Sequence, residues 1–103
     1  MPSDFTRPEP PPAVGRVPAR VGTLARRLGV GVLVYLYPGG RKGGSDALWM
    51  FTVAGAEVGS WSPRSRRARI LATRVRCANG SDAVRAVAAA VNRQRVNAAG
   101  RAA

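Results

Sequence analysis

The sequence predicts an α+β domain in which a three-stranded antiparallel sheet packs against two C-terminal helices. Two observations lead to this fold class. Between about residues 30 and 61, short runs of β-branched and aromatic residues alternate with glycine and proline, which is typical of strands and turns. After Ser62-Pro63, apolar residues recur at helical spacing instead. A chain of 103 residues allows one small domain, which we place at residues 22–98.

The first part of the chain, residues 1–21, is predicted to be a disordered, proline-rich tail. Six of the eight prolines lie there, and the run Pro8–Pro12 favours an extended polyproline conformation that cannot pair into a sheet. Such a run serves either as a plain spacer or as a docking peptide for an aromatic groove. At the other end of the chain, residues 99–103 are expected to fray.

A short helix is expected at residues 22–28. Leu24 and Leu28 are four residues apart, so they share one helical face, and Thr23 is the candidate cap. Gly29 is the residue at which such a helix would end.

Three strands follow, at about residues 30–37, 48–53 and 57–61. Their alternation predicts that Trp49, Phe51 and Val53 share a face, and a turn at Gly55-Ala56 joins the last two strands. In the first strand, one face is expected to carry Val32, Val34 and Leu36, and the other Leu33, Tyr35 and Tyr37.

The segment 63–78 is predicted to be a helix. Proline directly after Ser62 is a helix start signal, Asn79-Gly80 is a stop, and five apolar residues fit the helical period: Ala68, Leu71, Ala72, Val75 and Ala78. The competing prediction is a strand over 70–77, because apolar and arginine residues also alternate there. We prefer the helix because arginine, alanine and leucine are strong helix formers.

A last helix is expected from Ala83 to about Val96. Ser81-Asp82 is the predicted cap, and the apolar stripe consists of Val84, Val87, Ala88 and Val91.

The charge balance is the strongest functional signal. Lysine and arginine number 17 against five acids, a net charge of +12 in which Lys42 is the only lysine. A GC-rich genome explains arginine in place of lysine, but it does not explain the shortage of acids. A field of this size attracts phosphate backbones, acidic proteins or anionic membranes. We expect a nucleic acid, with DNA preferred over RNA.

Candidate binding residues fall into three groups. Six arginines within residues 64–76 have no acid among them, which is unlike a surface laced by ion pairs. The glycine-rich loop after the first strand adds two cations, and two tyrosines of that strand are candidates for stacking on bases, whereas Trp49, Phe51 and Trp61 are expected in the core. The predicted nucleic-acid contacts are therefore Arg64, Arg66, Arg67, Arg69, Arg74, Arg76, Arg41, Lys42, Tyr35 and Tyr37.

Enzymatic chemistry is not expected. Histidine is absent, and the spacing of the five acids brings no two of them to one site. The single Cys77 provides no intramolecular disulfide and no paired-thiol metal motif, and a buried structural thiol is the expected role. The glycine-rich loop has its lysine in the wrong order for a phosphate-binding P-loop. We therefore expect no cofactor and no metal.

The segment Leu48–Ala72 resembles part of the AP2-type and integrase arm-type DNA-binding domains. The matching residues are Trp49, then Val58-Gly59-Ser60-Trp61, then Ala68 and Ala72. This resemblance implies that an exposed sheet face enters the major groove of DNA. The helix–sheet–helix order and Ser65–Arg69 are also similar to double-stranded RNA-binding domains.

The sequence thus predicts a small, basic nucleic-acid-binding protein. The alternative is a small interaction or inhibitor protein, of phage or mobile-element type, that docks on an acidic protein surface. A homodimer is compatible with the sequence but not required by it. The N-terminus lacks a secretory signal pattern and the apolar run Val30–Tyr37 is too short to span a bilayer, so we expect a cytoplasmic location, nucleoid-associated in a bacterium, and no membrane partner.

Overall fold

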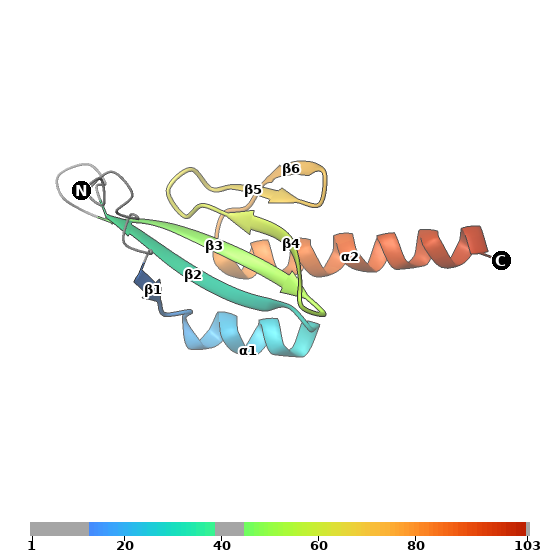
Figure 1. Cartoon of the computed structure of the whole chain (residues 1–103), viewed down its shortest axis with the longest axis horizontal. Helices are drawn as coiled ribbons and strands as arrows, with labels where there is room; N and C mark the ends of the chain where they lie inside the picture. The colour runs from blue at the N-terminus through green and yellow to red at the C-terminus, as the bar shows by residue number, and fades with distance from the viewer. Residues whose placement is uncertain (1–12, 39–44, 103) are drawn as a thin grey trace, which may run out of the picture.

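The computed structural model describes residues 13–38 and 45–102. The elements are, in chain order, β1 (Ala13–Gly15), α1 (Ala19–Leu28), β2 (Gly31–Pro38), β3 (Ser45–Val53), β4 (Ala56–Trp61), β5 (Arg67–Ile70), β6 (Thr73–Arg76) and α2 (Gly80–Ala102). The strands form one antiparallel sheet in sequence order (Figure 1). The α+β class and the packing of the C-terminal helix on the sheet are confirmed, but the described sheet has six strands rather than three.

The central strands β2, β3 and β4 form the predicted meander. Val34 pairs with Trp49, which pairs in turn with Trp61, so these side chains point to the same face of the sheet. The turn between β3 and β4 lies one residue earlier than expected, at Ala54-Gly55, where φ is 51° and 80°. Two consecutive positive φ values are typical of the tight hairpin turn that matches strand twist.

The predicted tail is wrong for residues 13–21. Residues 13–15 form β1, which pairs with β2 and places Val14 opposite Tyr35, and α1 begins at Ala19. Gly15 lies beside Val34, and a Cβ atom on Gly15 would come within 3.0 Å of Val34 Cγ1. The proline run Pro8–Pro12 lies outside the described residues.

Helix α1 is longer than predicted, and its cap differs. Pro18 occupies the N-cap position, and Thr23 lies inside the helix, where its Oγ1 donates a hydrogen bond to the Ala19 carbonyl over 3.0 Å. The predicted end is confirmed, because Gly29 has a φ of 72° and donates its N–H to the Arg26 carbonyl.

The helix predicted at 63–78 is wrong, because this segment forms the β5–β6 hairpin. Ala68 and Ile70, each 3% exposed, alternate with exposed arginines, which is the period of a strand. The residues that the helical pattern groups with Ala68 gain little burial: Ala72, Val75 and Ala78 are all exposed. The competing strand prediction over 70–77 is confirmed for the four residues of β6.

Helix α2 contains the predicted apolar stripe, and Val84, Val87 and Val91 are buried. It starts earlier than expected, and its cap is Asn79, whose Oδ1 accepts a hydrogen bond from the Asp82 N–H over 2.8 Å. Instead of fraying at residue 99, the helix continues to Ala102. Its second half runs past the sheet (Figure 1), and every residue from Asn92 to Gly100 is exposed. No helix in the described parts of the chain is both long and apolar enough to cross a membrane.

One core joins both helices to one face of the sheet, which we call the helix face. The predicted core residues Trp49, Phe51 and Trp61 are confirmed as buried. The two indole rings meet edge to face, 5.1 Å apart at 86°, and Trp61 Nε1 donates a hydrogen bond to the Cys77 carbonyl over 3.0 Å. Since both helices lie on this side, neither covers the opposite side, which we call the open face.

Candidate nucleic-acid interface

Four arginines lie together on the open face of the β5–β6 hairpin. Arg67 is directly opposite Arg76, and Arg69 is directly opposite Arg74. Directly opposed residues of antiparallel strands point to the same side, and here they alternate with Ala68 and its partner on the helix face. We call these four residues the arginine quartet.

The quartet has no acidic partner among the described residues. The ion pairs found there join Arg64 to Asp46 and Arg85 to Asp82. Like charges placed directly opposite each other destabilise a sheet, so this arrangement carries a folding cost that no ion pair of the described residues offsets. A site that works against local stability in this way is the kind of place where function is expected.

The quartet borders a shallow hollow of about 500 Å³. Ser60, Ser62 and Leu48 line the same hollow, so it extends from the cationic hairpin across β4 to β3. Its size lies within the range of small-molecule sites, but it is open to solvent rather than enclosed. An open hollow lined by guanidinium groups suits one section of a long polyanion.

The rest of the open face carries accessible apolar side chains together with the acids Asp46 and Glu57, which lie opposite Tyr37 and Thr52. Val14 is 71% exposed, Leu33 46% and Tyr37 41%. Tyr35 is half-buried and lies on the same face, as predicted, although β3 and β4 separate the two tyrosines from the quartet. The structure therefore brings tyrosines and arginines to one face without direct contact between them.

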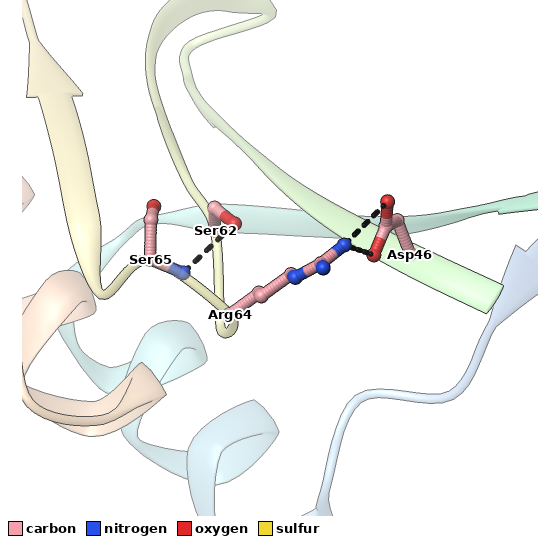
Figure 2. A network of polar contacts seen from close by, with 4 residues as sticks. All are labelled: Asp46, Ser62, Arg64 and Ser65. Atoms are coloured by element: carbon pink, nitrogen blue, oxygen red, sulfur yellow. Dashed lines mark hydrogen bonds and ion pairs between the residues drawn. The ribbon is translucent and has the colours of Figure 1, made fainter. Parts of the chain in front are cut away.

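Arg64 lies at the margin of this face and is held by an acid. Its Nη1 donates to both carboxylate oxygens of Asp46, over 3.0 Å and 3.3 Å, as Figure 2 shows. The neighbouring turn is closed by the Ser65 N–H, which points to Ser62 Oγ at 3.5 Å. Both partners of the ion pair are about half exposed, so it contributes at most about 1 kcal/mol to stability.

Arg66 does not belong to the quartet. It has a φ of 59° and lines a different hollow, beside the start of α2, together with Arg20 and Arg85. The arginines of α1 and of the exposed half of α2 lie away from the open face as well, so only part of the charge is concentrated there. Two further predicted contacts, Arg41 and Lys42, lie outside the described residues.

Several residues of this surface were not among the predicted contacts. They are Val14, Leu33, Leu48, Met50, Ser60 and Ser62. The alternation of side chains along each strand could have indicated these residues. However, it shows which of them share a face only once the order and register of the strands are known.

Cys77, the single cysteine, is buried, and its backbone carbonyl accepts a hydrogen bond from Trp61 Nε1. Burial raises the pKa of its thiol, and the negative charge of Asp82 raises it further. The thiol is therefore protonated at neutral pH, which is the state of a structural cysteine rather than of a nucleophile.

Comparison of the chain with protein-family profiles, with curated proteins and with solved structures found no match.

Proposed function

We propose that the protein binds DNA and that the arginine quartet contacts the backbone phosphates. The observation that carries this proposal is the direct opposition of Arg67 to Arg76 and of Arg69 to Arg74 without an acidic partner in the described fold. Guanidinium groups bind phosphate oxygens with two parallel hydrogen bonds, and a bound phosphate removes the repulsion within each opposed pair.

The remaining arginines have a supporting role in this proposal. The net charge of +12 attracts a phosphate backbone over a distance, whichever face the cations occupy. Release of condensed counterions then makes the affinity strongly dependent on salt. Neither catalysis nor a cofactor is part of the proposal.

The test is titration of fluorescently labelled DNA at several salt concentrations. Replacing Arg69 and Arg74 by glutamine should weaken binding and reduce the slope of log affinity against log salt by about 1.5, since each lost phosphate contact removes about 0.7–0.9. The matched control is the double variant Arg26→Gln, Arg27→Gln, which removes the same charge from exposed positions on α1. It should have a clearly smaller effect.

Two results would count against the proposal. One is the absence of DNA binding at low salt, and the other is an equal loss of affinity in the quartet and control variants. Retention of polyglutamate but not of DNA would favour the alternative of an acidic protein partner.

A further inference from the structure

Two neighbouring rows of side chains cross the open face and change character in the same order. The first row runs from β1 to β6 through Val14, Tyr35, Leu48, Ser62, Arg67 and Arg76. The second runs from β2 to β6 through Leu33, Met50, Ser60, Arg69 and Arg74. Each row passes from apolar residues to a serine and then to two arginines.

The spacing of these rows follows from sheet geometry. They are two residues apart along each strand, which is about 6.8 Å. Within a row, the arginines of β5 lie about 10 Å from the side chains of β3, because two strand spacings separate them. A partner that matches both rows needs negative charges repeated along one edge and flat apolar groups on one side of that edge.

A single DNA strand has this distribution of charge and apolar surface. Its phosphates repeat along the backbone at intervals similar to the distance between the rows, and its unpaired bases project to one side with their faces free. A duplex hides the faces of its bases. The open face, five strand spacings or about 24 Å wide, is also about twice as wide as the major groove of B-DNA.

We propose that the open face binds single-stranded DNA, with one nucleotide on each row. The phosphates lie on the arginines of β5 and β6, and the bases lie over β2 and β3, where Tyr35 provides a ring for stacking. This inference rests on the proposed function and specifies its substrate.

A third row is present, but its arginine, Arg64, is neutralised by an ion pair with an acid of the same row. Tyr37 is opposite Asp46, and Asp46 holds Arg64 (Figure 2). The substitution Asp46→Asn removes a negative charge from the face and frees a guanidinium. We expect it to tighten binding to single-stranded DNA and to steepen the salt slope by about 0.7, one additional phosphate contact. A gain in affinity cannot result from unfolding.

The main experiment compares three labelled probes at one salt concentration: a short oligothymidylate, its duplex with oligoadenylate, and an abasic strand of equal length. Oligothymidylate should bind about tenfold more tightly than the abasic strand, because stacking of a base on an aromatic ring has this magnitude. It should also bind more tightly than the duplex.

Two sets of variants distinguish the contribution of the tyrosine end of the rows, which contacts bases, from that of the arginine end, which contacts phosphates. Tyr35→Ala should weaken binding of oligothymidylate about tenfold and leave the abasic strand unchanged, whereas Tyr35→Phe should retain wild-type affinity. The variant Arg69→Gln, Arg74→Gln should weaken both probes. If Tyr35→Ala does not fold, Tyr35→Leu replaces it, because leucine keeps an apolar cover on the sheet and lacks a ring.

The outcomes separate this inference from the proposed function. Duplex binding at least as tight as that of oligothymidylate, with loss only in the quartet variant, overturns the single-strand inference and leaves DNA binding intact. Equal or tighter binding of oligouridylate overturns the choice of DNA. Binding to phosphatidylserine vesicles but to no nucleic acid overturns both proposals.

Discussion

Gly80 shows how closely one residue couples the helix face to the core. It is the first residue of α2 and is buried against Trp49, whose ring meets that of Trp61. A Cβ atom on Gly80 would lie 2.5 Å from Trp49 Cζ3 and 2.6 Å from Cη2. The indole of Trp49 is buried and in edge-to-face contact with Trp61, so moving it aside would disturb that contact.

We predict that Gly80→Ala lowers the free energy of unfolding by about 1–3 kcal/mol, the usual cost of forcing a methyl group into a packed core. Gly100→Ala is the matched control, because Gly100 is in the same helix and nothing lies within 4 Å of its Cβ position. There, the better helix propensity of alanine should leave stability unchanged or slightly higher. Urea denaturation of both variants is the measurement, and equal effects would contradict the described packing.

The thiol of Cys77 predicts a specific dependence of stability on pH. Burial, followed by Asp82, raises its pKa above the ordinary value of 9.0. The folded state therefore holds the proton more tightly than the unfolded state. Its contribution to stability is complete below pH 9.0 and is lost as the pH rises through the folded pKa.

We expect the free energy of unfolding to fall more steeply above pH 9.0 in the wild type than in Cys77→Ala. Native protein should also react slowly with iodoacetamide at neutral pH and rapidly once it is unfolded, which mass spectrometry can follow. Rapid alkylation of the native thiol would contradict its burial.

Secondary structure was predicted correctly where a segment fits only the strand pattern, and incorrectly where it fits both the strand and the helix pattern. Strands β2 to β4 were predictable because Val32 to Leu36 and Trp49 to Val53 belong to short runs of β-branched, aromatic and other apolar residues bounded by glycine or proline, without a competing helical pattern. In the segment 63–78, both periods fit. Tertiary structure selects the strand over the helix here, because β4 pairs with β5 and Ala68 and Ile70 are buried on the helix face.

The formation of a hairpin instead of a helix also produces the candidate site. In a helix, the six arginines of residues 64–76 would be distributed around its surface. In the hairpin, four of them share one face, Arg64 is held by Asp46, and Arg66 turns away with a φ of 59°. The residue types of the site were predictable from the sequence, but the grouping was not, because register is set by the whole sheet.

The repulsion between opposed arginines in the β5–β6 hairpin leads to a prediction about the free energy of unfolding. Replacing Arg69 and Arg74 by glutamine should raise the free energy of unfolding by about 0.2–1 kcal/mol, because a directly opposed like-charge pair is removed. The control Arg26→Gln, Arg27→Gln should lower it by a similar amount, since cations in the last turn of α1 interact favourably with the helix dipole. Thermal unfolding at low salt tests both signs. A loss of stability in the hairpin variant would mean that the quartet is structural.

For the whole molecule, the excess of positive charge opposes folding and favours binding. Only two ion pairs are formed among the described residues, and both are exposed, so they offset little of a net charge of +12. Compaction of the chain brings these cations together, which destabilises the folded state through self-repulsion. A polyanion that binds the folded state stabilises it by mass action in addition to screening this repulsion.

Salt should therefore move stability and DNA affinity in opposite directions. Raising sodium chloride from about 0.01 M to 0.1 M shortens the screening length from about 30 Å to 10 Å, so the melting temperature should rise by several degrees as repulsion weakens. Over the same range DNA affinity should fall, because counterion release becomes less favourable. Differential scanning fluorimetry and anisotropy titration on one preparation measure the two quantities. A melting temperature that falls with salt would mean that attractive ion pairs outweigh repulsion, and the unpaired quartet would then lose its significance as a binding signal.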